Sequence, residues 1–182
     1  MEPPCWDEVF EDPSKPFAFE FGSSKGDFLI EYAHMFPERN ILGTEVRKPL
    51  VENLLKRIES EELKNAHVLY GNIIPRFMEF IPPSTIEEII ILFPDPWVKK
   101  KHYKRRVVTE GFLDVVARIL EPGRSIKMAT DHEILFGDTL ETLGLHSEFK
   151  RVDPEPLPLK SHWHKYCERT GRPIQFLQFS RR

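Results

Sequence analysis

The sequence predicts an α/β protein whose central sheet is doubly wound, with helices on both faces. Short apolar segments with strand character alternate with helical segments through five units. The run from Ile89 to Phe93 is continuously apolar, as expected for a strand covered on both faces in the middle of a parallel sheet. A chain of 182 residues is long enough for one buried core, so we expect a single domain over residues 1–182.

The first half of the chain contains three predicted strand–helix units. Pro16 and Gly22 bound the first strand, and Pro37 ends the helix that follows. In both longer helices the apolar residues recur at helical spacing. The expected elements are strands over 17–21, 40–46 and 67–70, a helix over about 27–35 with Phe28, Leu29, Tyr32 and Phe36 on one face, a helix from Pro49 to about Glu62 with Leu50, Leu54, Leu55 and Ile58 inward, and a short helix that includes Phe77 and Ile81.

The second half begins with the strongest strand signal, over residues 86–93. After a basic loop, Thr109 is expected to cap a helix that reaches Leu120 and is broken by Pro122-Gly123. The remaining expected elements are a strand over 125–129, a helix over 131–143, a strand over 149–152, a proline-rich connection and a final strand over 174–180.

Residues that follow the predicted strands are polar or form turns. Ligands of doubly wound sheets bind outside the carboxyl ends of the strands. We therefore expect these residues to gather at one crevice. They are residues 22–26, Glu45, Gly71-Asn72, residues 94–97 and Thr130-Asp131.

Basic residues are concentrated in one short segment. The formal net charge is −3, but six of the 26 lysines and arginines lie within residues 99–106, which leaves 20 positive against 29 negative charges, or −9, elsewhere. A cationic segment on an acidic body is typical of a local polyanion site. No apolar run approaches the roughly 18 residues of a membrane span, no signal peptide is visible, and Cys5 and Cys167 match no metal-ligand spacing. We therefore expect a cytoplasmic protein with no metal and no membrane partner.

The turn after the first strand, Glu20-Phe21-Gly22-Ser23-Ser24-Lys25-Gly26-Asp27, is a candidate nucleoside site. Glycines there let backbone N–H groups approach a ligand, although an ordinary tight turn has the same composition. Glu45 follows Gly26 by 19 residues, where Rossmann-like proteins place an acid that holds a ribose diol. A helix N-terminus would favour an acid there too. Asn72 after Gly71 either hydrogen-bonds an adenine edge or belongs to a turn.

The segment Phe93-Pro94-Asp95-Pro96-Trp97-Val98-Lys99-Lys100-Lys101-His102 carries the strongest local signal. Two prolines fix the backbone around Asp95 and hold its carboxylate at the end of the buried strand. Trp97 offers a face on which a base can stack, and the basic residues from Lys99 to Arg106 offer phosphate contacts. The alternative is a rigid surface loop followed by a solvated charge run.

Polar residues elsewhere in the chain give weaker signals. Asp131 is placed to reach a substrate beside Asp95, although Thr130 and Asp131 also suit a helix N-cap and first turn. The seven histidines show no metal pattern, and His162 and His164 are expected to face solvent or RNA. No nucleophile–base pair indicates covalent catalysis.

Together these segments resemble the bacterial tRNA (guanine-N7-)-methyltransferases, which have the class I S-adenosylmethionine-dependent fold. The resemblance runs from about residue 17 to the end in the family's order, and its most specific part is Phe-Pro-Asp-Pro-Trp with its basic continuation. It implies a Rossmann-like, mostly parallel sheet with an antiparallel C-terminal strand, and methylation of guanine 46 in the tRNA variable loop. The segments that carry it are residues 20–29, Gly43-Thr44-Glu45-Val46, residues 93–97 with the following lysines, and Ala129-Thr130-Asp131.

The resemblance also implies roles for single residues, with Asp95 as the active-site acid beside cofactor and guanine. This chain has Ser24 where the family usually has a glycine. It has His164-Lys165-Tyr166-Cys167 where the family has Thr-x-Tyr/Phe-Glu, so it keeps Tyr166 alone. The expected S-adenosylmethionine-binding residues are Glu20, Gly22, Gly26, Glu45, Asn72 and Asp95, and the expected tRNA-binding residues are Trp97, Lys99, Asp131 and Tyr166.

Three other functions share part of this pattern. A small-molecule methyltransferase would use the cofactor residues but would gain nothing from the basic segment. A nicotinamide-dependent enzyme would use the glycine turn and Glu45, but the chain lacks the full Gly-x-Gly-x-x-Gly spacing. A non-catalytic RNA-binding module would need the basic segment without Glu45 and Asp95. The sequence does not distinguish a monomer from a homodimer.

Overall fold

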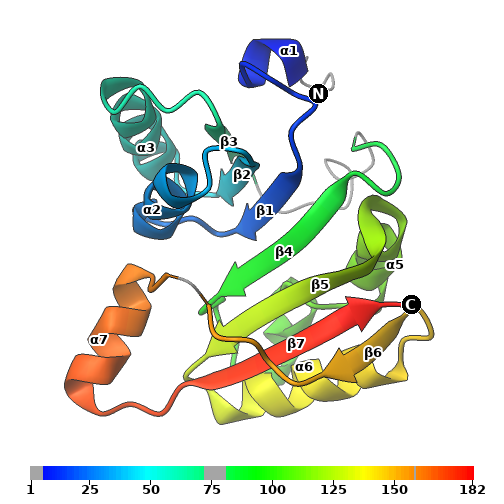
Figure 1. Cartoon of the computed structure of the whole chain (residues 1–182). Helices are drawn as coiled ribbons and strands as arrows, with labels where there is room; N and C mark the ends of the chain where they lie inside the picture. Colours follow the sequence, from blue (N-terminus) through cyan, green and yellow to red (C-terminus); the bar gives the residue numbers. More distant parts are fainter. Residues whose placement is uncertain (1–5, 72–80, 158) are drawn as a thin grey trace.

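The computed structural model describes residues 6–71, 81–157 and 159–182, which contain a seven-stranded sheet (Figure 1). The strand order is β3-β2-β1-β4-β5-β7-β6, with β1 to β5 parallel and β7 antiparallel between β5 and β6. The predicted doubly wound, mostly parallel sheet is confirmed. The strands are β1 (Phe17–Phe21), β2 (Asn40–Glu45), β3 (Ala66–Tyr70), β4 (Ile86–Leu92), β5 (Leu120–Thr130), β6 (Phe149–Val152) and β7 (Gln175–Arg181).

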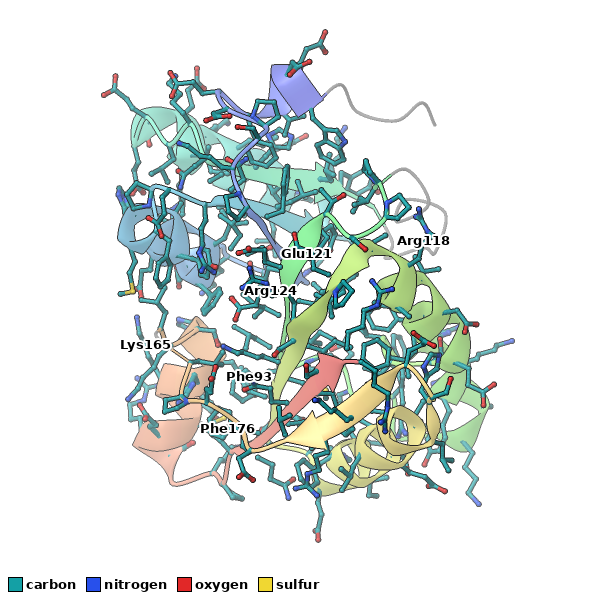
Figure 2. All side chains as sticks on the ribbon, turned by 45° about the vertical axis from the view of Figure 1, so that its right-hand side comes forward. Phe93, Arg118, Glu121, Arg124, Lys165 and Phe176 are labelled. Atoms are coloured by element: carbon teal, nitrogen blue, oxygen red, sulfur yellow. The ribbon has the colours of Figure 1, made fainter. Side chains whose placement is uncertain are left out.

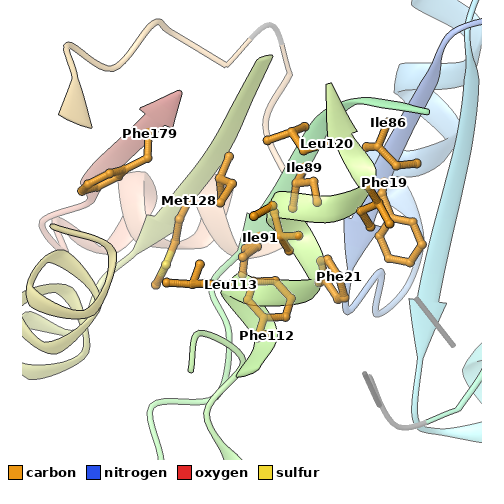
Figure 3. Close-up of a cluster of buried hydrophobic side chains, with 14 of the residues drawn as sticks. Phe19, Phe21, Ile86, Ile89, Ile91, Phe112, Leu113, Leu120, Met128 and Phe179 are labelled. Atoms are coloured by element: carbon orange, nitrogen blue, oxygen red, sulfur yellow. The ribbon is translucent and has the colours of Figure 1, made fainter. Parts of the chain in front are cut away.

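Helices cover both faces of the sheet because the central strands are apolar on both sides. Phe19 and Ile89 belong to the cluster formed with α5 and α6 (Figure 3). Ala18 and Ile90, one residue along each strand, pack with α2 and α3 on the other face. The helices are α1 (Trp6–Val9), α2 (Asp27–Met35), α3 (Lys48–Ser60), the 3-10 helix η1 (Lys100–Arg105), α5 (Glu110–Ile119), α6 (Glu133–Leu145) and α7 (His162–Thr170).

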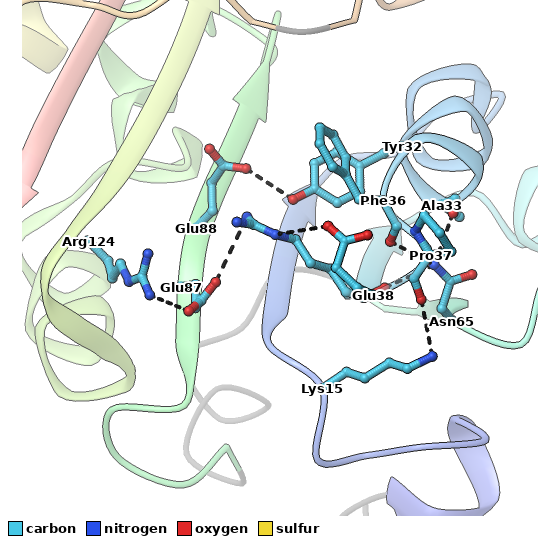
Figure 4. A network of polar contacts seen from close by, with 11 residues as sticks. Lys15, Tyr32, Ala33, Phe36, Pro37, Glu38, Asn65, Glu87, Glu88 and Arg124 are labelled. Atoms are coloured by element: carbon cyan, nitrogen blue, oxygen red, sulfur yellow. Dashed lines mark hydrogen bonds and ion pairs between the residues drawn. The ribbon is translucent and has the colours of Figure 1, made fainter.

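A polar network links α2 to β4 and β5 at the amino-terminal side of the sheet (Figure 4). The Tyr32 hydroxyl donates to Glu88 Oε2 at 3.3 Å. Glu87 pairs with Arg39, whose Nη1 lies 3.8 Å from its carboxylate, and also with Arg124. These pairs fasten the first βαβ unit to the second half of the sheet without occupying the carboxyl ends of the strands.

The boundary between α5 and β5 differs from the prediction. Thr109 caps α5 as expected, since its Oγ1 accepts from Phe112 N at 3.2 Å. However, β5 begins at Leu120, so Pro122-Gly123 lies inside its bounds. The pairing of β5 with β4 shifts register at this point. A bulge tolerates a proline, because the bulged residues make no ladder hydrogen bonds.

Among the described residues, three helices were not predicted from the sequence, namely α1, η1 and α7. Of these, α7 lies where a proline-rich connection was expected. Its buried residues are His164 and Cys167, so no ordinary apolar stripe marks it. The capping signals were present. Ser161 Oγ accepts from His164 N at 3.3 Å, and Gly171 ends the helix with φ +68°.

Two smaller expectations concern the region between β2 and β4. In α3, Val51 is buried together with Leu54 and Ile58, whereas Leu50 and Leu55 are half-buried. The short helix predicted around Phe77 lies outside the described residues, as does Asn72, and Ile81 is buried beyond the last residue of that gap.

Gly26 fixes the entry into α2. It adopts a left-handed conformation with φ +79°, which most side chains disfavour. A Cβ at this position would lie 2.1 Å from Leu54 Cδ1 of α3. The glycine therefore permits both the turn and the close approach of α2 to α3.

We expect Gly26→Ala to destabilise the protein more than Gly123→Ala does. Gly123 is also left-handed, with φ +82°, but its surroundings are open. Gly123→Ala should cost about 1–2 kcal/mol for the left-handed backbone, and Gly26→Ala should cost about 1–3 kcal/mol more for overpacking. Urea unfolding of both variants measures the difference, and equal losses would contradict the packing role of Gly26.

Candidate active site

The turn after β1 is fastened to the end of β2. Ser23 N donates to Thr44 O at 2.8 Å, and Ser24 N donates to Glu45 Oε2 at 2.9 Å. Ser24 adopts φ +52°, a conformation that glycine takes without strain. The glycine turn and the acid predicted from sequence are therefore in direct contact.

Glu45 is buried, and its carboxylate is engaged by Arg47. The backbone N and Nε of Arg47 donate to Oε1 at 2.9 and 3.0 Å, and Nη2 donates to Oε2 at 3.2 Å. Burial opposes ionisation of Glu45, but these hydrogen bonds and that from Ser24 outweigh it and hold its pKa below the usual value. A ribose diol would use the same two oxygens, so the exposed Arg47 side chain must move aside to admit one.

Glu20 brings a second carboxylate to the same place. It is 2% exposed, and its Oε2 has no hydrogen-bond partner among the described residues. Burial raises the pKa of Glu20 to about 7, and the negative charge of Glu45 acts in the same direction. A buried carboxyl with a free oxygen favours a cationic or hydrogen-donating ligand.

The loop that carries Asp95 is held in an unusual backbone conformation. Phe93 and Trp97 have φ +50° and +43°, each costing roughly 1–3 kcal/mol for a non-glycine residue. Phe93 N donates to Ala129 O at 2.8 Å, which fixes the start of the loop to β5. Asp95 itself is exposed.

Asp95 lies on a cavity at this edge of the sheet and close to the Glu45 pair. The cavity has a volume of about 360 Å³ and is lined by Asp95, Pro96, Trp97, Val98, Lys99 and His102. The pKa of Arg47 is raised first by its hydrogen bond to Glu45 and also by the negative charge of Asp95. The ends of β2 and β4 therefore bring Arg47 and Asp95 within electrostatic range of each other.

Helix α7 lies beside the carboxyl ends of β4 and β5 (Figure 1). Its His164 ring contacts Phe93 and Phe176 at centroid distances of 6.1 and 5.9 Å (Figure 2 labels both phenylalanines). His164 is thus buried, and the expectation that it faces solvent or RNA is wrong because two aromatic rings enclose it. Burial also lowers its pKa. His162 is exposed, as expected.

Asp131 is also engaged by the C-terminal part of the chain. Arg172 Nη1 lies 3.2 Å from its Oδ2. Cys167 is buried next to it, and burial followed by the charge of Asp131 raises the pKa of the thiol. Thr130 is not the helix cap, because His132 occupies the N-cap of α6 and Thr130 Oγ1 accepts from His132 N at 3.2 Å.

Two aromatic surfaces flank this edge. Tyr166 packs against Trp163 with 4.8 Å between ring centroids, and the guanidinium of Arg172 lies 5.6 Å from the Tyr166 ring. Trp97 contacts His102, and the guanidinium of Arg105 lies 5.0 Å from the centroid of the Trp97 ring. Arg47, Trp163 and Arg172 were not predicted as site residues, although all three lie within a few residues of predicted site positions.

The basic segment is mostly surface. Lys99, Lys100, Lys101, Lys104 and Arg105 are exposed along η1. Arg106 is the exception, with 8% exposure. The expectation that the whole run from Lys99 to Arg106 contacts phosphates is therefore wrong for Arg106, whose guanidinium is enclosed by protein groups.

Comparison with known proteins shows the family of the chain. A family model described as "Putative methyltransferase" matches residues 14–172. A tRNA (guanine-N(7)-)-methyltransferase of Synechococcus sp. (strain CC9311) is 34% identical over 192 residues, covering 100% of this chain and 81% of that protein. One of Thermosynechococcus vestitus is 33% identical over 166 residues, covering 91% and 78%. The chain belongs to the tRNA (guanine-N7-)-methyltransferase family.

Solved structures of other methyltransferases share the fold of this family member. The 16S rRNA methyltransferase KamB matches with a TM-score of 0.67 and 15% identity, covering 100% of this chain and 95% of that one. An rRNA methylase from Streptococcus thermophilus matches with a TM-score of 0.60 and 13% identity, covering 96% and 90%. At such identities the likeness shows the fold alone.

The family membership and the methyltransferase fold predicted from sequence are thus confirmed, and the roles of single site residues stay predictions. Within the described ranges no helix is long and apolar enough to cross a membrane. The same residues contain no group of three or more His, Cys, Asp or Glu side chains arranged to hold a metal ion.

We expect Glu20→Gln to stabilise the ligand-free protein at pH 8 and to have little effect below pH 4.5. Because the folded-state pKa of about 7 exceeds the ordinary 4.5, the folded protein keeps a proton that the unfolded chain has lost between these values. The stabilisation of the folded protein by this protonated carboxyl is therefore fully present below pH 4.5 and is lost as the pH rises through 7. The gain at pH 8 should approach about 3 kcal/mol.

Denaturant unfolding from pH 4 to 8 measures this difference, and Glu45→Gln is the matched control. The pKa of Glu45 is lowered in the folded protein, so Glu45→Gln should destabilise most at neutral pH and least in acid. Parallel pH profiles for the two variants would contradict the buried, proton-retaining state of Glu20.

Proposed function

We propose that this protein transfers the methyl group of S-adenosylmethionine to N7 of a guanine in tRNA, with guanine 46 of the variable loop as the target. The observation that carries the proposal is the juxtaposition of three features at one sheet edge. These are two buried acids at the carboxyl ends of β1 and β2, Asp95 on an open cavity after β4, and an exposed basic segment beside that cavity.

The residues fit the cofactor. The unpartnered, buried Oε2 of Glu20 suits the α-ammonium group of the methionine part, and the Glu45 carboxylate suits a ribose diol once Arg47 moves. Gly22, with φ +78° and open space around it, lets the backbone approach the ligand. Asn72 completes the proposed set from the family motif, although it lies outside the described residues. S-adenosylmethionine would supply an electrophilic methyl group on a sulfonium.

The substrate chemistry needs positioning more than proton transfer. Guanine N7 has an in-plane lone pair, so the N7–carbon bond can form as the carbon–sulfur bond breaks, with its electron pair passing to sulfur. The methylated purine is cationic. We assign Asp95 to orient the guanine through its N–H groups and to stabilise this growing charge. Trp97, Asp131 and Tyr166 would contact the tRNA around it.

The basic segment argues for a polyanion over a small-molecule substrate. Lys99 lines the cavity and is followed by further exposed cations on η1. A small substrate would leave these charges unused, and a non-catalytic RNA-binding module would not need the acids behind Asp95. We therefore place the whole chain, as one domain, among cytoplasmic enzymes that modify tRNA.

We expect the wild-type protein with S-adenosylmethionine to form 7-methylguanosine in tRNA and Asp95→Asn to lower kcat on the order of 100-fold. The affinity for tRNA should change little, because Asp95 acts on the reacting base and makes no phosphate contact. Mass spectrometry of digested tRNA and a binding titration measure the two effects. A wild-type protein that forms no 7-methylguanosine, or equal losses in kcat and affinity, would refute the proposal.

We expect replacement of Lys99 and Lys100 by Gln to weaken tRNA binding and to flatten its salt dependence. Each lost phosphate contact should reduce the slope of log affinity against log salt by roughly 0.7–0.9. The matched control replaces the exposed Lys64 and Lys150, which lie before β3 and in β6, away from the cavity. An unchanged slope for the first pair, or the same change for both pairs, would show that the basic segment does not bind tRNA.

A further inference from the structure

Arg106 differs from every other cation of the basic segment in its surroundings. Its side chain is 6% exposed, and its guanidinium lies 3.6 Å from the centroid of the Tyr103 ring. The neighbouring Lys104 and Arg105 are exposed. A buried guanidinium cannot contact a phosphate without leaving its site. The role of Arg106 must therefore differ from that of the exposed cations in the segment.

The contacts of Arg106 connect the loop after β4 to α6. Nε donates to the carbonyl oxygen of Pro96 at 2.9 Å, and Nη1 pairs with the carboxylate of Asp138 on α6. Pro96 is the residue between Asp95 and Trp97. The planar guanidinium can hold both partners at once in a fixed geometry, which an ammonium group does not reproduce.

The loop requires support of this kind. Phe93 and Trp97 are left-handed non-glycine residues, and such conformations persist only where the surroundings hold them. Pro94 and Pro96 have no N–H groups to donate, so the loop can make few hydrogen bonds of its own. Phe93 N is bonded to Ala129 at one side, and Arg106 reaches the other side at Pro96.

We propose that Arg106 is a positioning residue that holds Asp95 and Trp97 in place by tying the Pro96 carbonyl to Asp138, and that it does not bind tRNA. The proposal rests on the proposed function, because it deepens the role of Asp95. The basic segment thus contains cations of two kinds. The exposed ones bind phosphates, and the buried Arg106 fixes the loop that lines the cavity.

The experiment compares Arg106→Met and Arg106→Lys with Lys104→Met. We expect both Arg106 variants to lower kcat at saturating tRNA by about 100-fold, as a small displacement of a reacting group does. They should keep the wild-type salt dependence of tRNA affinity. Lys104→Met should instead reduce that salt slope by about one. Asp138→Ala should reproduce a smaller part of the kcat loss, because the Pro96 contact remains.

Hydrogen exchange of the loop gives a readout that is independent of turnover. The amides of Phe93 and His102, which donate to Ala129 O and Lys99 O at the two ends of the loop, should exchange faster in both Arg106 variants. The amides of β1 should be unchanged, and Lys104→Met should keep the wild-type protection. If Arg106→Met does not fold, Arg106→Lys carries the same comparison.

Two results would overturn the proposal. One is unchanged loop exchange in a folded Arg106 variant, and the other is a reduced salt slope with wild-type kcat, which would mark a phosphate ligand. If the wild-type protein forms no 7-methylguanosine, the proposed function fails, and the exchange comparison still decides whether Arg106 holds the loop.

Discussion

The burial of β4 on both faces is the constraint on which the site depends. Ile89, Ile90 and Ile91 are completely buried, with Ile90 packed against the α2–α3 side and its two neighbours against the α5–α6 side. The strand is paired with β1 and β5 along its length, so it cannot shift along its axis. The chain therefore leaves the sheet at a fixed point, and the position of Asp95 three residues beyond Leu92 follows from the core.

Charge is separated across the proposed crevice. Glu20 and Glu45 are buried at the carboxyl ends of β1 and β2, and their mutual repulsion contributes to the raised pKa of Glu20. The exposed lysines lie at the rim beside the cavity. A cationic ligand would relieve the buried acids, and a phosphate backbone would neutralise the rim. A net charge of −3 conceals both requirements, because they concern opposite charges in different places.

The sequence predicted the parts of the site that depend on chain geometry. The ends of the strands could be located because glycine, proline and polar residues follow them, and the apolar run of β4 identified the centre of the sheet. The partners that each side chain contacts in the folded protein could not be predicted. Arg47 on Glu45 and Arg106 under Pro96 both depend on distances across the fold, which a run of basic residues does not reveal. The same limit hid α7, whose buried side chains are a histidine and a cysteine.

Helix α7 packs on the sheet through two side chains that are not ordinary core residues. His164 and Cys167 stand at the positions where the resemblance leads one to expect Thr and Glu, and both are buried. The helix is held to the sheet by the contacts of His164 with Phe93 and Phe176. Because Phe93 also begins the loop that carries Asp95, the same contact that seats α7 braces the start of that loop. Tyr166 is half-exposed next to Arg172 and its partner Asp131. The buried His164 and Cys167 therefore fix a helix that presents the Tyr166 ring beside Asp131.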